Sequence, residues 1–366
     1  MAFDAFKLAV PGVRGLQPYI PGKPIEELER EYGVKNVIKL ASNESPLGPS
    51  PKALAAAQAA LPEIARYPDG GGFALKRALA TNLGVLPEQI TLGNGSNDIL
   101  EFAARAFVSA QDEVIFSQHA FAVYPIVTQA VGARAVEVPA RNWGHDLDAM
   151  HAAITAHTRL VFIANPNNPT GTWLRRAALK EFLDKLPASV IMVVDEAYFE
   201  YVEDSDYPNT VGWLTRYPNL ICARTFSKIY GLAGLRVGYG ISSPAIADLL
   251  NRVRQPFNVN SIAQAAALAA LDDHAHLDMA RRVNADGMQQ LVKGFEQLGL
   301  NYIPSVGNFV CVEVGEAGQV YEQLLRAGVI VRPVANYGMP RHLRVTVGLA
   351  NENQRFLDAL KAVLGR

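Results

Sequence analysis

Residues 160–171 read LVFIANPNNPTG, an apolar run followed at once by a loop with two prolines and one glycine. These residue types restrict the backbone, so residues 165–171 are expected to form a sharp loop directly after a buried strand. In open α/β sheets, ligands bind at the carboxyl ends of the parallel strands, where this loop would lie. Asn-Pro and Thr-Gly are also good turn formers, so a plain strand-to-helix turn is the alternative for this stretch taken alone.

On both sides of this loop, short apolar runs alternate with amphipathic stretches of helical period. The alternation is typical of a mainly parallel sheet flanked by helices, so we expect an α/β fold. Helices are expected at residues 98–109, 120–131 and 174–186. Strands are expected at residues 89–92, 113–116, 135–138, 160–164, 190–194, 220–223 and 236–241.

The pattern changes after about residue 260, where strands and longer helices alternate in a way that favours a smaller α+β domain. The first forty residues are broken by prolines and glycines, and within them only residues 25–32 read as a helix. We therefore expect an N-terminal segment (1–41) that packs on the small domain or on a partner, a large domain (42–260) and a small domain (261–366). Within the small domain, helices are expected at 261–271, 277–298, 319–326 and 352–364, and strands at 309–314, 329–332 and 343–347.

The composition excludes several broad classes of protein. Of the 366 residues, 49% are hydrophobic and 19% are charged, which is typical of a globular protein and not of a disordered or collagen-like chain. The formal charge of −1 argues against nucleic acid as the main partner. The apolar runs are far shorter than the ~20 residues that cross a bilayer, so no membrane association is expected. Two isolated cysteines provide neither a disulfide framework nor a zinc site, and the start lacks a secretory signal, so we expect a cytoplasmic protein without a metal.

Polar side chains follow the next two strands as well. The run at 190–194 ends in Asp195, with Tyr198 three residues later, and the run at 220–223 leads to Lys228 within RTFSK. Considered alone, Asp195 could be a cap for the following segment, and Lys228 could be a solvated surface charge. Together with the asparagines of the first loop they match a pyridine-ring aldehyde with a phosphate. A lysine can form a Schiff base, a carboxylate can keep the ring nitrogen protonated, and a phenol and an amide can bind the ring hydroxyl.

A phosphate group requires backbone N–H groups at a helix start, hydroxyls and an arginine. The turn at residues 93–98 (GNGSND) lies between an expected strand and an expected helix. Its spacing does not fit the G-x-G-x-x-G dinucleotide motif, because Asp98 occupies the position of the last glycine. The turn is therefore a candidate cradle for a phosphate.

The sequence resembles the fold-type I pyridoxal-phosphate aminotransferases of the aspartate aminotransferase superfamily, and most closely their histidinol-phosphate branch. The resemblance extends over nearly the whole chain. It implies a large domain with a mainly parallel sheet, a smaller α+β domain, and pyridoxal 5'-phosphate as the cofactor. It rests on LQPY (16–19), SNESP (42–46), RYPD (66–69), NPNNPTG (165–171), DEAY (195–198), RTFSK (224–228), GLRVGY (234–239) and LRVTVG (343–348).

The resemblance assigns roles around the cofactor ring. It makes Lys228 the Schiff-base lysine and Asp195 the partner of the ring nitrogen, and it places Asn168 and Tyr198 on the ring hydroxyl. The family commonly has a stacking tyrosine where this chain has Phe121, which keeps the aromatic face and loses the hydroxyl. His119 is a second candidate for stacking. The alternative interpretation is that His119 is a partly buried, hydrogen-bonded side chain with no contact to the cofactor.

For the phosphate, the same match implies an arginine, two hydroxyls and two backbone donors. These are Arg236, Thr225, Ser227, Ser96 and Asn97.

The remaining roles concern the substrate and the subunits. Tyr67 resembles a tyrosine that the neighbouring subunit contributes to the phosphate, which implies a homodimer with shared active sites. Arg344 matches the arginine that holds the substrate's acidic group, and a guanidinium suits a carboxylate or a phosphate. Arg332, Tyr19 and Asn43 are supporting candidates, although each alone could be a surface or capping residue.

The implied reaction is a ping-pong exchange of an amino group between a small-molecule amino donor and a 2-oxo acid. In the histidinol-phosphate branch, the reaction converts histidinol phosphate and 2-oxoglutarate to imidazole acetol phosphate and glutamate, within histidine biosynthesis. An aromatic amino acid aminotransferase would share every cofactor residue, and a decarboxylase of phosphorylated amino acids is a further relative. A non-catalytic regulatory module is the alternative from another class. It would usually carry a DNA-binding extension, whereas here only about forty residues precede the expected sheet and the chain is not basic.

Overall fold

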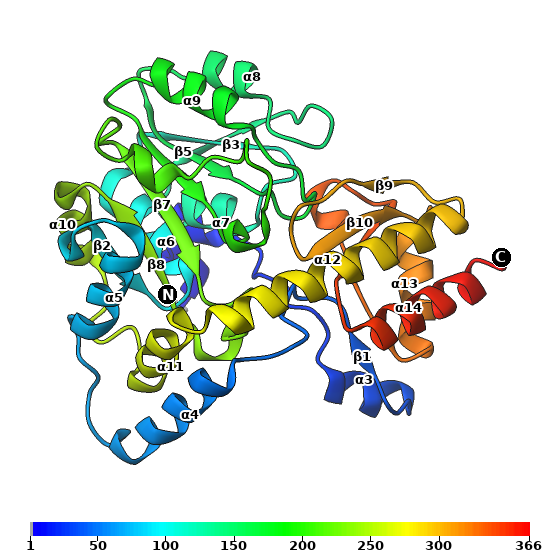
Figure 1. Ribbon diagram of the computed structural model, residues 1–366. Coiled ribbons are helices and arrows are strands. Elements are labelled where there is room, and N and C mark those ends of the chain that lie inside the picture. Colours follow the sequence, from blue (N-terminus) through cyan, green and yellow to red (C-terminus); the bar gives the residue numbers. More distant parts are fainter. Residues whose placement is uncertain (1–2) are drawn as a thin grey trace.

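A seven-stranded sheet forms the centre of the larger part of the molecule (Figure 1). The computed structural model describes residues 3–366. The strand order is β2-β8-β7-β6-β5-β3-β4, and the pairs among β3 to β7 are parallel, whereas β8 runs antiparallel to β2 and β7. The mainly parallel sheet is therefore confirmed. The strands are β2 Ile90–Gly93, β3 Glu113–Ser117, β4 Arg134–Val138, β5 Thr158–Ala164, β6 Ile191–Asp195, β7 Leu220–Thr225 and β8 Gly238–Ser242.

Helices cover both faces of this sheet because alternate strand residues point to opposite faces. Val161 and Ile163 of β5 belong to the apolar core under α4, α5, α8, α9 and α11, whereas Leu160 and Phe162 belong to the core under α6, α7 and α10. The helices are α4 Pro51–Ala60, α5 Phe73–Leu83, α6 Ser96–Phe107, α7 Val123–Ala130, α8 Leu147–Ala152, α9 Arg176–Lys185, α10 Pro244–Val253 and α11 Ser261–Leu271.

Among the expected elements that begin later than the sequence pattern indicated, two follow a residue with a left-handed backbone. The strand expected at 236–241 begins at Gly238, because Arg236 has a left-handed backbone (φ 57°) that cannot continue a strand. The helix expected at 120–131 begins at Val123, after a loop in which His119 also has a positive φ of 57°. Helices α4, α5, α8 and α10 were not assigned from the sequence.

A second, four-stranded antiparallel sheet, in the order β12-β13-β10-β9, forms the centre of the smaller part. The strand expected at 329–332 is two strands: β11 pairs with β1 and β12 pairs with β13, so the chain changes sheet at Val331. The strands are β1 Ile38–Lys39, β9 Tyr302–Ile303, β10 Phe309–Glu313, β11 Val329–Ile330, β12 Arg332–Pro333 and β13 His342–Thr346. The helices are α12 His274–Gln297, α13 Ala317–Arg326 and α14 Ala350–Val363.

Helix α12 joins the two parts, and Figure 1 shows it running from one to the other. Near its start, Leu277 and Ala280 pack into the core of the large sheet. Near its end, Leu291 and Phe295 pack into the core of the small sheet. The domain boundaries at residues 41 and 260 stay a prediction.

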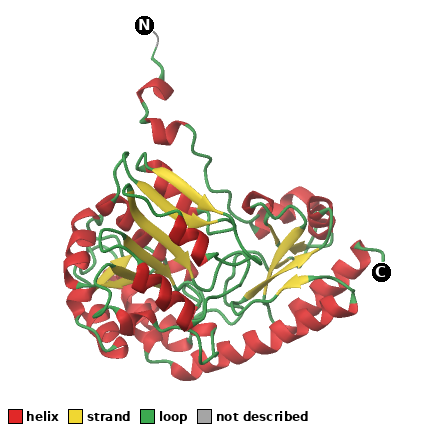
Figure 2. Cartoon of the chain, turned by 90° about the horizontal axis from the view of Figure 1, so that it is seen from above, coloured by secondary structure: helices red, strands yellow, loops and turns green. Residues whose placement is uncertain are grey.

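The N-terminal segment holds more helix than expected. Besides α3 (Ile25–Tyr32), two four-residue helices form, α1 (Ala5–Leu8) and α2 (Pro11–Arg14), so the expectation of a single helix was wrong. Asp4 caps α1 by accepting hydrogen bonds from two backbone N–H groups, and a proline begins α2, where its missing N–H has no cost. Helix α2 lies against the end of α7, where a Cβ at Gly12 would come 2.0 Å from the Gln129 carbonyl oxygen. Figure 2 shows α1, beyond it, projecting from the rest of the chain.

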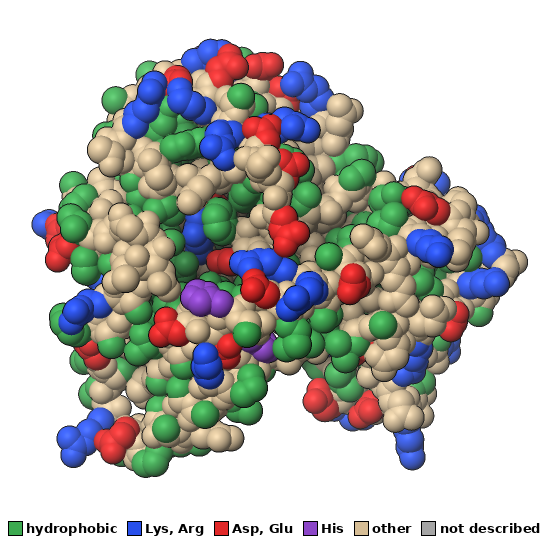
Figure 3. Space-filling model, viewed as in Figure 1, with side chains coloured by type: hydrophobic (Ala, Val, Ile, Leu, Met, Phe, Trp, Pro, Cys, Tyr) green, Lys and Arg blue, Asp and Glu red, His purple; other side chains and the backbone are tan. Residues whose placement is uncertain are grey.

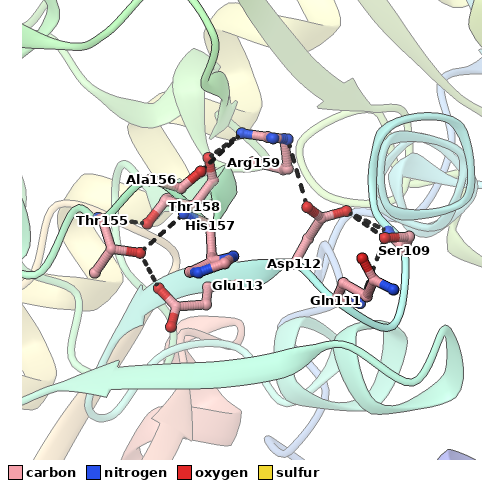
Figure 4. A network of polar contacts seen from close by, with 9 residues as sticks. All are labelled: Ser109, Gln111, Asp112, Glu113, Thr155, Ala156, His157, Thr158 and Arg159. Carbon is pink, nitrogen blue, oxygen red and sulfur yellow. Dashed lines mark hydrogen bonds and ion pairs between the residues drawn. The ribbon is translucent and has the colours of Figure 1, made fainter.

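The two edges of the large sheet differ in chemistry. At the amino ends of β3 and β5, polar side chains form a network (Figure 4): Thr155 donates a 2.6 Å hydrogen bond to buried Glu113, and the Ser109 hydroxyl donates a 2.6 Å hydrogen bond to Asp112. At the carboxyl ends, the register places Ala164 beside Asp195 and Asp195 beside Ala223. The loops that follow β5, β6 and β7 therefore begin side by side.

The surface carries charges of both signs. On the face shown in Figure 3, Lys and Arg side chains are interspersed with Asp and Glu. Within residues 3–366, no helix is long and apolar enough to cross a membrane.

Candidate active site

One cavity lies where the carboxyl ends of β5, β6 and β7 face the four-stranded sheet. Every predicted site residue lines it except Tyr67 and His119, the second candidate for stacking. The lining residues come from both sheets and from the N-terminal segment. They are Tyr19, Asn43, Ser96, Asn97, Phe121, Asn168, Asp195, Tyr198, Thr225, Ser227, Lys228, Arg236, Arg332 and Arg344.

Lys228 lies three residues after the end of β7, with its amine inside the cavity. Its Nζ donates a 3.3 Å hydrogen bond to the carbonyl of Ser42 and lies 5.7 Å from the centre of the Tyr198 ring. Burial, and after it the nearby Arg344 guanidinium, lowers the pKa of Lys228 from 10.5 to about 8. A substantial fraction of the amine is therefore neutral just above neutral pH, which is the form that acts as a nucleophile or base.

Asp195 is the last residue of β6 and its side chain is buried. Oδ2 accepts a 3.0 Å hydrogen bond from Tyr124 Oη, and Oδ1 accepts a 3.2 Å bond from the Ala197 backbone N–H. Burial raises the pKa of Asp195 to about 6, while the Tyr124 hydroxyl opposes this rise. Sequence reasoning missed Tyr124, although it is the last residue of the QHAFAVY segment that was searched for the stacking residue.

Tyr198 and Asn43 form a buried pair beside Lys228. Asn43 Nδ2 donates a 2.8 Å hydrogen bond to Tyr198 Oη, and the Asn43 carboxamide oxygen accepts a bond from Thr346. Burial raises the pKa of Tyr198, so its phenol stays protonated at neutral pH. The phenol is therefore a hydrogen-bond donor for a group in the cavity.

The start of α6 and the loop after β7 form an anion cradle. The residue before the helix is Gly95, which has no side chain to cap it, so backbone N–H groups at Ser96 and Asn97 are free for a ligand. A Cβ at Gly238 would lie 2.4 Å from the Ser96 nitrogen, so only glycine allows this close approach. Arg236 Nη1 lies 3.4 Å from Ser227 Oγ at the same place. An uncapped helix start, a hydroxyl and an arginine fit a phosphate group.

A second cation near Lys228 is Arg344, on β13. Arg344 is 6% exposed; its Nη1 donates a 2.5 Å bond to Asn168 Oδ1, and its Nη2 donates a 2.6 Å bond to the Ala41 carbonyl. Among the ion pairs within residues 3–366, none includes this guanidinium, and its Nε has no hydrogen-bond partner there. Because a buried charge normally has a partner of opposite sign, Arg344 is prepared for an anionic ligand.

The N-terminal segment closes one side of the cavity near Arg332. Arg332 Nη2 donates a 2.7 Å hydrogen bond to the Ile20 carbonyl, and its guanidinium lies 5.7 Å from the centre of the Tyr19 ring. Both side chains line the cavity together with Arg344. They can therefore contact a ligand that Arg344 holds.

The two candidates for ring stacking separate. Phe121 lines the cavity, whereas His119 lies outside it and its Nδ1 is 2.5 Å from the Tyr337 carbonyl oxygen. His119 is thus the hydrogen-bonded histidine of the alternative interpretation. Tyr67 is 81% exposed and stacks on Phe257 with ring centres 4.6 Å apart, so it does not reach the cavity of its own chain.

A buried ion pair, which sequence reasoning also missed, joins Glu196, directly after β6, to Arg224 of β7, the strand that leads to Lys228. Arg224 Nη2 lies 2.9 Å from Glu196 Oε2, and Thr210 donates a 2.6 Å bond to the other carboxylate oxygen. Both charged side chains are almost fully buried. Glu196 directly follows Asp195 in DEAY, and Arg224 begins the RTFSK motif that ends in Lys228. These positions in the two motifs could have indicated the pair.

The fold and this cavity define a class of enzyme, and comparison with known proteins agrees. The family model described as aminotransferase class I and II matches residues 35–360. The chain therefore belongs to the class I and II aminotransferases.

Its relatives have a narrower description. The chain is 62% identical to histidinol-phosphate aminotransferase 2 of Pseudomonas fluorescens (strain Pf0-1), with 100% of both chains covered. It is 61% identical to histidinol-phosphate aminotransferase 1 of Nitrosococcus oceani, with 98% of this chain and 97% of the relative covered. A crystal structure of histidinol-phosphate aminotransferase from Sinorhizobium meliloti in complex with pyridoxal-5'-phosphate has a TM-score of 0.90 and 33% identity, covering 98% of this chain and 97% of that chain.

Proposed function

We propose that this enzyme transfers the amino group of histidinol phosphate to 2-oxoglutarate, giving imidazole acetol phosphate and glutamate, with pyridoxal 5'-phosphate as its cofactor. One observation carries the proposal. Two separate anion positions, at Arg236 and at Arg344, lie in one cavity with Lys228. The first suits a cofactor phosphate and the second suits the acidic group of a substrate. The full-length similarity to histidinol-phosphate aminotransferases supports the substrate.

The residues of the cavity fit the cofactor. The backbone N–H groups of Ser96 and Asn97, with Arg236, would hold the phosphate, assisted by the hydroxyls of Thr225 and Ser227. When bound, pyridoxal 5'-phosphate supplies a protonated ring that withdraws electron density from the substrate carbon.

Other side chains would hold the ring itself. Asp195 would bind the ring nitrogen as a carboxylate, and Tyr198 and Asn168 would bind the ring hydroxyl. Phe121 would cover one face of the ring.

The chain's own residues can move the proton that the reaction requires. The lowered pKa of Lys228 makes its Nζ a base near neutral pH, so it can take a proton from the substrate's amine-bearing carbon and then give that proton up as a general acid. Asp195 would pair with the ring nitrogen and favour its protonated form. Arg344, with Arg332, Tyr19 and Asn43 around it, would orient the substrate by its anionic end.

Steady-state kinetics test the substrate directly. With 2-oxoglutarate as acceptor, kcat/KM for histidinol phosphate should exceed the values for phenylalanine and tyrosine. A higher value for either aromatic amino acid would instead support the aromatic aminotransferase. Release of carbon dioxide would support the decarboxylase, and no transfer from any donor would support a non-catalytic role.

The proposal includes a cytoplasmic homodimer with shared active sites. Tyr67 supports the dimer, because an exposed tyrosine stacked on exposed Phe257 is suited to reach a neighbouring subunit. Residues 1–41 would pack on the small domain or the partner, with domains at 42–260 and 261–366. Sedimentation of the purified protein at several concentrations tests the dimer, and a monomer at every concentration would contradict it.

A further inference from the structure

Tyr124 of α7 is the residue near the cavity whose chemistry the proposed function leaves unused. Its ring is fully buried and stacks on Phe162 with centres 4.7 Å apart and planes 4° apart. Phe121 packs edge-on against the same ring at 6.0 Å. The ring orientation is therefore fixed by packing, and its hydroxyl points at Asp195, 3.0 Å from Oδ2.

This hydroxyl bond completes the support of the Asp195 carboxylate. The Ala197 N–H binds Oδ1 and the Tyr124 O–H binds Oδ2, so each oxygen has one donor. A carboxylate held at both oxygens cannot rotate without losing a charge-assisted hydrogen bond. Burial raises the pKa of Tyr124 well above its usual value, so the phenol remains a donor.

We propose that Tyr124 is a positioning residue for the cofactor: its hydroxyl orients the Asp195 carboxylate and keeps it ionised for the ring nitrogen. The proposal rests on the proposed function, because it requires a cofactor ring beside Asp195. Tyr124 itself does not line the cavity. It therefore acts through Asp195 and not on the substrate.

The charges around Asp195 show why this donor matters. Burial is the largest effect and raises the pKa of Asp195, and the Glu196 carboxylate raises it further. Opposing them are the Tyr124 hydroxyl first, then the Ala197 N–H and the Lys228 amine. Without the phenol, the pKa of Asp195 should rise by about one to two pH units, the usual effect of a hydrogen bond to a charged group. At neutral pH, much of the carboxylate would then be protonated and unable to pair with a cationic ring.

The first test uses the cofactor-free protein. Tyr124→Phe keeps the ring and its packing and removes only the hydroxyl. The titration of Asp195, followed by carbon NMR of labelled aspartate and assigned by the signal missing in Asp195→Asn, should shift upward by about one to two pH units. Tyr217→Phe is the matched control, because Tyr217 Oη donates a 2.7 Å bond to Asp184 outside the cavity. An unshifted Asp195 in Tyr124→Phe, or an equal shift in the control, would overturn the proposal.

The second test measures the binding of pyridoxamine 5'-phosphate, which cannot attach covalently to Lys228. Relative to wild type, Tyr124→Phe should bind it about twofold to tenfold more weakly at pH 7, with nearly equal affinity at pH 9, as follows from the expected ionised fractions. In an Asp195→Asn background, Tyr124→Phe should change the affinity no further. A loss of equal size at both pH values would indicate a merely structural role. Failure of the wild type to bind would instead contradict the proposed function.

A third variant covers the case in which Tyr124→Phe does not fold. Replacement of Tyr124 alone by 3-fluorotyrosine retains the ring and gives a more acidic phenol, hence a stronger donor. The titration of Asp195 should then shift to lower pH. An unchanged or higher midpoint would contradict the proposal.

Discussion

Arg344 Nη1 donates a 2.5 Å hydrogen bond to Asn168 Oδ1 and so connects β13 of the four-stranded sheet with the loop after β5 of the large sheet. The residue that we propose for the substrate's anionic end thus touches a residue that we propose for the cofactor ring. An anion that binds Arg344 competes for, or shares, the guanidinium that holds Asn168. Substrate and cofactor recognition are therefore physically linked at this contact.

Arg344→Lys should impair substrate binding strongly. Lysine keeps the charge and loses the planar fork, so it cannot hold Asn168, Ala41 and an anion together. We expect KM for histidinol phosphate to rise about 30-fold or more, because removing one partner of a buried charged contact typically weakens binding by at least this factor. Arg326→Lys, at an exposed pair with Glu322, is the control and should leave KM unchanged. A wild-type KM in Arg344→Lys would place the substrate's acidic group elsewhere.

Lys228→Ala should abolish amino transfer while the phosphate cradle still binds pyridoxal 5'-phosphate. Mass spectrometry after borohydride treatment should show the cofactor attached to the wild type and absent from the variant. In the wild type, covalent attachment requires the neutral amine. Its rate should therefore rise with pH and level off above the Lys228 pKa of about 8. Wild-type turnover in Lys228→Ala, or a rate independent of pH between 6 and about 9, would contradict this role.

Asp195→Asn should damage the rate far more than the fold. We expect kcat to fall about 100-fold or more, because the amide cannot keep the ring nitrogen protonated. Burial raises the Asp195 pKa from 3.8 to about 6, so between these values the folded protein binds more protons than the unfolded one. This carboxyl therefore makes cofactor-free wild type less stable as pH rises from about 4 to 6, and the variant should lack that contribution. Urea unfolding at both pH values measures it, and an identical pH dependence in the two proteins would argue against a buried, titrating Asp195.

Gly238→Ala should weaken cofactor binding through the phosphate cradle. The added Cβ would lie 2.4 Å from the Ser96 nitrogen and would push the start of α6 away from Arg236. We expect the dissociation constant of pyridoxamine 5'-phosphate to rise about tenfold or more, because one or more charge-assisted hydrogen bonds to the phosphate would be lost. Gly234→Ala is the control, since nothing lies within 4 Å of its added Cβ. Equal affinity in the two variants would show that the phosphate binds elsewhere.

Tyr67 can be tested by mixing two defective homodimers. If each site takes Tyr67 from its neighbour, a hybrid of Tyr67→Ala and Lys228→Ala subunits contains one intact site and one doubly defective site. Activity should then return on mixing, towards about half that of an equal amount of wild-type dimer in the hybrid fraction. The activity of each variant dimer alone, before mixing, is the baseline. No recovery in a verified hybrid would mean that Tyr67 serves its own subunit.

Much of the fold was open to prediction from local patterns. Apolar runs of strand length followed by helical periods indicated all seven strands of the large sheet. The signal is clearest for β3, β5, β6 and β7, because burial on both faces makes parallel strands nearly continuous in apolar residues. The start of β8 and the split of β11 from β12 were missed. Both depend on a change of backbone direction or of strand partner at Arg236 and Val331, which periodicity does not record.

The sequence by itself determined which residues stand at the ends of β5, β6 and β7, and hence that Asn168, Asp195 and Lys228 approach one space. This follows because parallel strands all present their carboxyl ends at one edge. Only the tertiary structure decided the pairs that complete the cavity: Tyr124 with Asp195, Asn43 with Tyr198, and Arg344 with Asn168. The partners in these pairs are 71, 155 and 176 residues apart, and they meet because helix α7, the N-terminal segment and the small sheet pack against the edge of the large one. Such contacts depend on how separate elements pack, and local sequence patterns carry no information about that packing.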